Sequence, residues 1–242
     1  QWTEGTVADN IHWTENLYSL KIDADVDTFV AGQFTSLALD IDGERIDRPY
    51  SFLSAPGQNP LEFFFYTATG GALSNAMLDL QSGDSIWLKK KPIGFFTLAE
   101  VPDSRDLWLF GTGTGIAPFF SILKTQEPWE RFEKVVLVHG VRANADLRYQ
   151  ELIENIQHDR GERFQFKAFV TRYDVPGASL ATLIASHIHV CPCPLVARYI
   201  FPCYVGLQLK TLPAISFNLL HKLLLPPLSA GRNASHHNHI LQ

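Results

Sequence analysis

Three short segments of the 242-residue chain contain residue types that suit a bound nucleotide. Residues 48–51, Arg-Pro-Tyr-Ser, offer a guanidinium for a phosphate beside an aromatic face and a hydroxyl. Residues 71–74, Gly-Ala-Leu-Ser, are expected to start a short helix, whose unpaired amides favour an anion such as a diphosphate. Residues 111–115 alternate glycine with threonine. In this order the segments predict binding sites for two different nucleotides.

The glycine-rich segment matches neither of the two best-known phosphate-binding loops. No Gly-Lys-Ser/Thr follows it, as a P-loop requires, and its Gly-x-Gly-x-Gly spacing before Pro118 differs from the dinucleotide fingerprint. An apolar run before it and helical spacing after it favour a nucleotide turn at the carboxyl end of a strand, where open sheets bind ligands. A plain strand-to-helix turn is the alternative.

Two arginines, Arg142 and Arg172, follow the next two expected strands. In a parallel sheet both loops open at the same edge as the glycine turn, so the guanidinium groups could converge there. Convergence would favour a further phosphate, and hence NADPH over NADH. Alternatively, both arginines are solvated and pair with Asp146 or Asp174.

The elements that must position these residues fall into two halves. Up to about residue 91, short segments rich in aromatic and branched residues alternate with turn formers such as Asp42-Gly43. They predict strands at 17–22, 34–39, 61–67 and 84–89, and one short helix at 72–80. This pattern is typical of a small antiparallel β-barrel.

From about residue 104 the pattern lengthens into strand, turn and helix. It predicts strands at 107–110, 134–139 and 164–170, a turn at 111–115 and helices at 116–125 and 145–158. This spacing fits successive βαβ units and a parallel, Rossmann-like sheet. The expected fold is β plus α/β in two domains, a β-barrel over 1–100 and a nucleotide-binding α/β domain over 101–242, with the boundary between Phe96 and Arg105.

Other catalytic chemistry has little support in the sequence. No Gly-x-Ser-x-Gly segment is present, so His139, at the end of a strand, is interpreted as structural. The carboxylates of Asp40, Asp42, Glu44 and Asp47 are interpreted as one solvated turn.

Composition limits the remaining classes of function. A net charge of -5 argues against general nucleic-acid binding, and 46% hydrophobic residues are enough for a buried core. Neither a signal peptide nor an apolar run of about 18 residues is visible, so we expect a cytoplasmic protein without a membrane span. The three cysteines give no disulfide framework.

The composition changes near Pro176. All 25 acidic residues lie between Glu4 and Asp174, and the last 68 positions contain none. At the earlier density about ten would be expected there. We interpret the segment after about residue 178 as atypical, read in another frame or spliced from elsewhere, so that it disrupts the α/β domain.

A metal site in this segment would have to use His187, His189, Cys191 and Cys193. Their one-residue spacing differs from the usual two-residue knuckle, and Pro192 limits the turn that would wrap both sulfurs around one ion. No metal site is predicted.

In combination and order, the segments resemble the ferredoxin–NADP reductase family, in particular its bacterial members with short chains. The similarity extends over about residues 7–178. The resemblance implies a barrel that binds FAD, an α/β domain that binds NADP(H), and hydride transfer between nicotinamide and flavin. It also implies single-electron exchange with ferredoxin or flavodoxin as partner. The flavin carries this chemistry, so no acid–base pair need be visible.

The resemblance further implies roles for individual residues. Arg48 would contact the diphosphate, Tyr50 would lie against the flavin ring, and the Ser51 hydroxyl would sit near N5 as the one catalytic position. The other cofactor-binding positions belong to the strand behind the flavin, the phosphate turn, the pyridine-nucleotide turn and the 2′-phosphate site: Phe64, Phe65, Tyr66 and Thr67; Ala72, Leu73 and Ser74; Thr112, Gly113, Thr114 and Gly115; and Arg142 and Arg172.

The family's later motifs are missing. Members carry a third basic residue after the Pro-Gly at 176–177, then a Cys-Gly-x-Pro motif and a final aromatic residue, yet the next arginine is Arg198 and no Cys-Gly pair exists. Two alternatives stay open: a flavin-binding product with a disrupted NADP domain, or the reductase component of an oxygenase system. We expect a monomer that binds neither nucleic acid nor a membrane.

Overall fold

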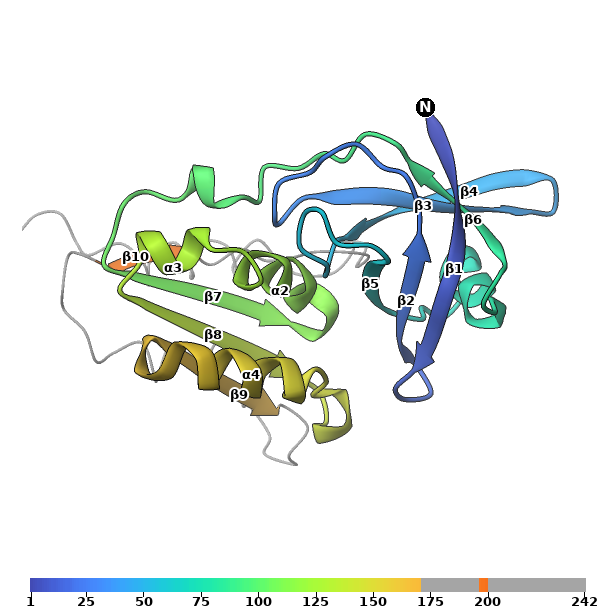
Figure 1. Ribbon diagram of the computed structural model, residues 1–242. Helices are drawn as coiled ribbons and strands as arrows, with labels where there is room; N and C mark the ends of the chain where they lie inside the picture. Colours follow the sequence, from blue (N-terminus) through green and yellow to red (C-terminus); the bar gives the residue numbers. More distant parts are fainter. Residues whose placement is uncertain (171–195, 200–242) are drawn as a thin grey trace, which may run out of the picture. The chain divides into compact units, whose positions relative to one another are not determined.

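The computed structural model describes residues 1–170 and 196–199, all within one compact unit, Gln1–Val205. The strands of this unit form two separate sheets, one antiparallel and one parallel (Figure 1). The fold predicted from the sequence, a β-barrel followed by a Rossmann-like parallel sheet, is confirmed.

Six strands form the antiparallel sheet, in the order β4-β3-β6-β1-β2-β5. They are β1 (Trp2–His12), β2 (Leu17–Asp23), β3 (Phe34–Ile41), β4 (Glu44–Ser51), β5 (Leu61–Tyr66) and β6 (Ser85–Lys89). A further antiparallel bridge joins Phe52, just after β4, to Phe63 of β5, so the two outer strands meet. The sheet thereby curls into a barrel around an apolar core that includes Phe52, Phe63 and Phe65.

The β3–β4 hairpin fixes the strand that carries the first predicted segment. Its turn is Asp42-Gly43, and both residues have positive φ, 51° and 82°. A type I′ turn needs this conformation at both positions, and Asp-Gly sequences favour it. The turn sets the register that pairs Tyr50 with Thr35, and a slip of one residue would turn Tyr50 to the other face.

Four strands form the parallel sheet, in the order β10-β7-β8-β9. They are β7 (Asp106–Thr112), β8 (Lys134–Val141), β9 (Phe164–Val170) and β10 (Val196–Tyr199). The helices of the described residues are α1 (Ala72–Ala76), α2 (Ala117–Leu123), α3 (Glu127–Arg131) and α4 (Gln150–Arg160). Short 3₁₀ turns are η1 (Met77–Asp79), η2 (Leu98–Glu100), η3 (Gly113–Ile116), η4 (Asn144–Asp146) and η5 (Gly161–Arg163). Because the strands are parallel, the chain leaves β7 and β8 at the same edge of the sheet.

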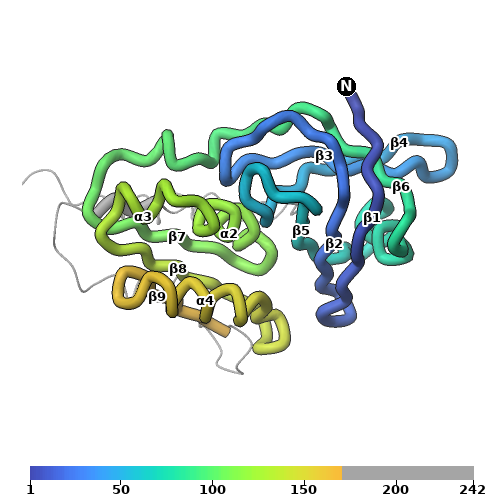
Figure 2. Tube along the Cα trace, in the orientation of Figure 1, coloured from blue at the N-terminus to red at the C-terminus, as the bar shows by residue number. Residues whose placement is uncertain are grey.

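Helices α2, α3 and α4 cover one face of the parallel sheet, and α4 runs beside β8 and β9 (Figure 2). Phe120 of α2, Trp129 of α3 and Ile153 of α4 share one apolar cluster with alternate residues of β7 and β8. The same cluster contains Leu17 and Phe64 of the barrel. The two sheets therefore share a buried apolar layer.

The structure corrects several boundaries predicted from the sequence. The sequence pattern predicts neither β1, β4 nor α3. Helix α4 begins at Gln150, not near residue 145, because η4 intervenes and Tyr149 has a φ of 64°. Gly111 and Thr112 belong to β7, so the turn predicted at 111–115 begins at Gly113.

The four carboxylates interpreted as one turn are also separated. Only Asp42 lies in the turn, whereas Asp40 is on β3 and Glu44 and Asp47 are on β4. Asp40 forms an ion pair with Arg45 at 2.8 Å.

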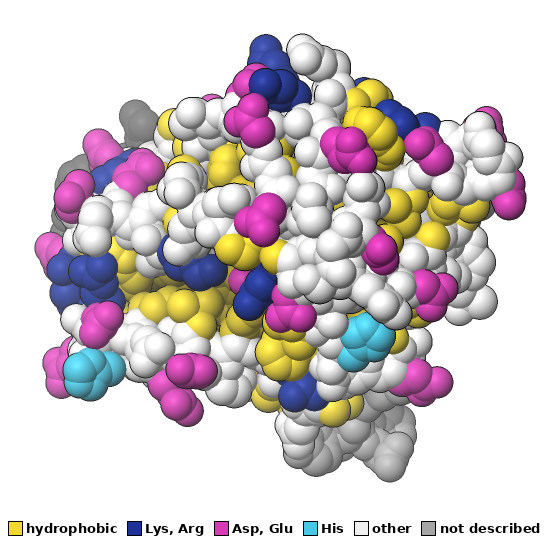
Figure 3. All heavy atoms as spheres, turned by 45° about the vertical axis from the view of Figure 1, so that its right-hand side comes forward, with side chains coloured by type: hydrophobic (Ala, Val, Ile, Leu, Met, Phe, Trp, Pro, Cys, Tyr) yellow, Lys and Arg dark blue, Asp and Glu magenta, His cyan; other side chains and the backbone are white. Residues whose placement is uncertain are grey.

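Beyond residue 170 the structure describes only β10, so several predictions lie outside the described residues: Arg172, Asp174, the four residues considered as metal ligands, and the change of composition near Pro176. Within the described part of the chain, no helix combines the length and apolar character needed to cross a membrane. On the face drawn in Figure 3, basic and acidic side chains are intermingled.

Candidate functional site

Gly113 and Tyr66 bring two of the predicted nucleotide-binding segments together. Gly113 begins η3 after β7 and has a φ of 51°, in the left-handed region that favours glycine. A Cβ atom at Gly113 would lie 3.0 Å from Cε2 of Tyr66, the last residue of β5. The ring at the end of the barrel strand therefore rests on the backbone of the glycine turn.

His139 of β8 holds the same turn. It is 1% exposed, and its Nε2 atom lies 2.9 Å from the carbonyl oxygen of Gly113. A carbonyl oxygen only accepts, so Nε2 carries the proton and donates it. Burial lowers the pKa of His139 to about 4, although the hydrogen bond to Gly113 acts in the opposite sense. A neutral imidazole thus fixes the glycine turn, which agrees with the structural role predicted for this residue.

The hydroxyl of Tyr66 faces a polar cluster from the segment after β8. Burial raises the pKa of Tyr66 to about 12, the charge of Asp146 and a hydrogen bond to it add to the rise, and the charge of Arg142 opposes it. Asp146 also accepts a hydrogen bond from the amide of Ala143 at 3.2 Å. The Tyr66 hydroxyl therefore stays protonated next to the carboxylate of Asp146.

Arg142 lies at the edge of this cluster. It directly follows β8 and is exposed. It forms no ion pair with Asp146 or with any other described residue, whereas the alternative partner Asp174 lies outside the described residues. Its guanidinium is available for an anion. Its convergence with Arg172 remains a prediction, because Arg172 lies outside the described residues.

Arg48, Tyr50 and Ser51 stand at the end of β4. Arg48 is exposed and donates from Nη1 to the carbonyl of Asp47 at 2.6 Å, which leaves its other donors for a ligand. Tyr50 is only 8% exposed and contacts Phe65 edge-on at 5.9 Å. Burial raises the pKa of Tyr50 to about 12, with Arg48 acting against the rise. Ser51 is half-buried. The segment thus combines an exposed cation, a largely buried ring and a half-buried hydroxyl.

The predicted positions on β5 divide into core and rim. Phe64 and Phe65 are 5% and 2% exposed and belong to the shared apolar layer and the barrel core, respectively. Both rings pack inside these apolar clusters, and their contact with a cofactor stays a prediction. Tyr66 and Thr67 are half-buried at the strand end, where Thr67 Oγ1 donates to Asn16 Oδ1 at 3.2 Å.

The predicted phosphate turn is compact. A Cβ atom at Gly71 would lie 2.7 Å from Ser74 Oγ, so glycine allows the close approach. The Ser74 hydroxyl donates to the Gly71 carbonyl at 3.3 Å and accepts from the Ala68 amide at 3.2 Å, and thus stabilises the turn itself. No side chain caps α1, so the amides of Ala72 and Leu73 at its start have no side-chain acceptor. Together with Arg48, this donor set fits a diphosphate.

The predicted pyridine-nucleotide turn joins β7 to α2. Thr112 is exposed, Thr114 is half-buried and Gly115 is buried. No side chain caps η3. The turn therefore offers backbone amides and two hydroxyls to a nucleotide.

Sequence reasoning misses two half-buried polar residues where the two sheets meet. Tyr149 donates from its hydroxyl to Glu62 Oε1 at 2.9 Å and also bonds Ser19 Oγ. Lys124 Nζ donates to the Leu53 carbonyl at 3.1 Å, and burial lowers the pKa of Lys124. Each pair is far apart in the chain, by 130 residues for Ser19 and Tyr149, so no local motif marks it.

Two family models match the chain. Residues 6–97 match the model described as oxidoreductase FAD-binding domain, and residues 109–180 match the model described as oxidoreductase NAD-binding domain. The first range contains Arg48, Tyr50 and the phosphate turn, and the second contains the glycine turn and Arg142.

Similar proteins carry related names. A flavodoxin/ferredoxin–NADP reductase from Shigella flexneri is 40% identical over 177 residues, which are 73% of this chain and 71% of that protein. The Escherichia coli K12 reductase of the same name is 39% identical over the same shares. A solved ferredoxin NADP+ reductase from Neisseria gonorrhoeae with bound FAD and NADP has a TM-score of 0.70 and 32% identity, over 77% of this chain and 76% of that chain. The chain therefore belongs to the ferredoxin–NADP reductase family.

Proposed function

We propose that the protein transfers hydride between NADPH and FAD and exchanges single electrons with ferredoxin or flavodoxin. The contact between Tyr66 and Gly113 carries the proposal, because it joins the end of the predicted flavin strand to the predicted pyridine-nucleotide turn. Reacting atoms must approach to about 3–3.5 Å, so the flavin site and the pyridine-nucleotide site must lie next to each other. A cytoplasmic location and a monomeric state are part of the same proposal.

The barrel residues bind and orient the flavin in this proposal. Arg48 and the amides at the start of α1 hold the diphosphate, since they combine a free cation with uncapped donors. The half-buried hydroxyl of Ser51 contacts the ring near N5. When bound, the flavin supplies hydride acceptance and one-electron transfer.

Residues of the parallel sheet orient the other nucleotide. The turn formed by Thr112, Gly113, Thr114 and Gly115 holds the pyridine nucleotide at the sheet edge, in a conformation that His139 fixes. Arg142 binds the 2′-phosphate, and Arg172 joins it. We place the division between the two binding domains near residue 100, since β6 ends at Lys89 and β7 begins at Asp106.

Anaerobic mixing of the purified protein with NADPH tests the proposal. A yellow protein with bound FAD whose absorbance bleaches on mixing supports it. A colourless protein that does not take up added FAD would contradict the flavin site. A yellow protein that NADPH does not bleach would support the alternative, a flavin-binding product with impaired catalysis.

A further inference from the structure

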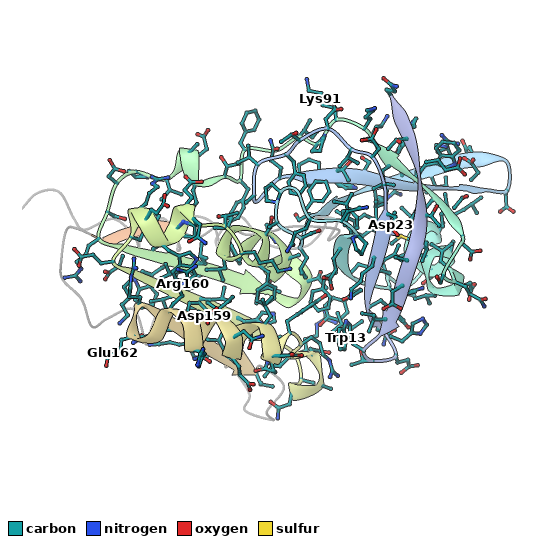
Figure 4. The ribbon with its side chains drawn as sticks, viewed as in Figure 1. Trp13, Asp23, Lys91, Asp159, Arg160 and Glu162 are labelled. Carbon is teal, nitrogen blue, oxygen red and sulfur yellow. The ribbon has the colours of Figure 1, made fainter. Side chains whose placement is uncertain are left out.

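A chain of hydrogen bonds connects the barrel to the segment before α4. Trp13 Nε1 donates to Ser19 Oγ at 2.7 Å, Ser19 Oγ bonds the hydroxyl of Tyr149, and that hydroxyl lies 2.9 Å from Glu62 Oε1. Trp13, Ser19 and Glu62 belong to the barrel side, at the β1–β2 hairpin, β2 and β5. Figure 4 shows the labelled Trp13 at the end of the barrel near the start of α4.

The donors and acceptors in this series of hydrogen bonds give the series one direction. A carboxylate only accepts, so the Tyr149 proton goes to Glu62. The Tyr149 oxygen must then accept from Ser19, whose own oxygen accepts from the indole of Trp13. Every proton is used once, and burial together with the charge of Glu62 raises the pKa of Tyr149 strongly. The hydroxyl therefore remains a fixed donor.

The backbone and ring of Tyr149 are held as tightly as its hydroxyl. Its φ of 64° lies in the left-handed region, which costs a tyrosine free energy and persists only where surrounding contacts impose it. Its ring packs against Trp13, Phe64 and Phe120 at centroid distances of 5.7, 5.1 and 5.3 Å. The preceding residue, Arg148, donates to the Trp13 carbonyl at 3.2 Å.

The segment from Arg142 to Tyr149 is thus anchored to the barrel twice, through Arg148 to the Trp13 carbonyl and through Tyr149 to Ser19 and Glu62. We propose that Tyr149 is a positioning residue for hydride transfer, which sets the placement of the nucleotide-binding sheet against the flavin barrel. This inference rests on the proposed function.

The position of Tyr149 predicts an effect on rate and not on affinity. The glycine turn and Arg142 both follow strands of the parallel sheet, so NADP(H) binds to groups that move together when the sheet shifts. The approach of nicotinamide to flavin depends on the sheet and the barrel jointly, and small misplacements of reacting groups cost large factors in rate. Loosening Tyr149 should therefore slow flavin reduction and leave NADP+ binding intact.

Tyr149→Phe and Tyr18→Phe form a matched pair for the test. Tyr18 is buried, and its hydroxyl donates to the Glu15 carbonyl within the β1–β2 hairpin, so its loss affects the barrel alone. We expect Y149F to retain FAD and to bind NADP+ within about twofold of wild type, while NADPH reduces its flavin at least tenfold more slowly. Y18F should match wild type in both measurements.

A double-mutant cycle between Y149F and Ser19→Ala tests the contact without NADPH. If the two hydroxyls form a hydrogen bond across the two sheets, the two substitutions should not act independently. The unfolding equilibrium constant of the double variant should differ about fivefold from the value expected when the two single effects are multiplied. Effects that multiply within about twofold would overturn the contact.

The kinetic outcomes separate this inference from the proposed function. If NADPH reduces the flavin of Y149F as fast as that of wild type, the positioning role alone is overturned. The same holds if flavin reduction is slowed as much in Y18F as in Y149F. Weakened NADP+ binding with an unchanged limiting rate would also overturn it. A wild-type protein that binds FAD and is not reduced by NADPH would overturn the proposed function, and this inference with it.

Discussion

Replacing His139 by glutamine should make the protein less sensitive to acid. The imidazole is buried and neutral, donates from Nε2 to Gly113, and has no partner for Nδ1 among the described residues. Burial lowers its pKa from 6.5 to about 4. The unfolded chain therefore binds this proton at higher pH than the folded chain does, and the free energy of unfolding falls as the pH drops through that window.

The two pKa values set the size of the effect. A difference of about 2.5 pH units, at about 1.4 kcal/mol per unit, lowers the free energy of unfolding by about 3 kcal/mol at pH values below both. Well above pH 6.5 the imidazole is neutral in both states and contributes no pH dependence. A glutamine amide keeps an N–H for the Gly113 carbonyl and does not titrate, so H139Q should lack this loss.

Urea unfolding of wild type and H139Q, followed by tryptophan fluorescence, measures the difference. Carboxylate titrations are common to both proteins and cancel when the two pH profiles are subtracted. Between about pH 7 and about pH 4.5, the wild type should lose about 2–3 kcal/mol more than H139Q. Profiles that stay parallel would refute the assignment of a buried neutral imidazole on the glycine turn.

Three further changes test the nucleotide seats. Arg48→Ala should weaken FAD affinity about 10- to 100-fold, since a charge-assisted contact is worth about 1.5–3 kcal/mol. The fluorescence of released flavin measures this loss. Arg45→Ala is the control, because the Arg45 guanidinium already pairs with Asp40. Arg142→Ala should narrow the NADPH-over-NADH ratio of kcat/KM by about tenfold, and an unchanged ratio would assign that arginine elsewhere. Gly113→Ala should destabilise the fold more than Gly43→Ala in urea unfolding. Both glycines have positive φ, but only Gly113 would place its Cβ against Tyr66, and equal losses would contradict that contact.

The strands that the sequence predicts well are those rich in aromatic and branched residues. Strand β9 has the predicted bounds, because an apolar, aromatic run stands between clear polar flanks. Strand β1 is central in its sheet, yet only Gly5 and Val7 of its eleven residues are buried, so its pattern carries no hydrophobic period. The charged residues of β4 give its sequence no strand pattern, and the tertiary pairing with β3 decides its conformation.

The candidate site likewise contains some residues that the sequence predicts and some contacts that it does not. Arg48 and the glycine turns can be predicted because local residue types determine local conformation and charge. The contact of Tyr66 with Gly113, and the hydrogen bond from His139 to the same residue, join segments that only the tertiary fold brings together. No spacing rule within one segment identifies such pairs, and this is also why Tyr149 escapes sequence reasoning.

The contacts between the two sheets also explain why an apolar layer alone would not serve this chemistry. Apolar burial is proportional to area and has no direction, so Leu17 and Phe64 stabilise the association without fixing it to a fraction of an ångström. Hydrogen bonds weaken steeply with distance and angle, so the bonds of Ser121 to the Ser54 carbonyl at 2.7 Å and of Tyr149 to Glu62 do fix it. Hydride transfer demands that precision, and the buried polar groups supply it because an unpaired partner there would cost free energy.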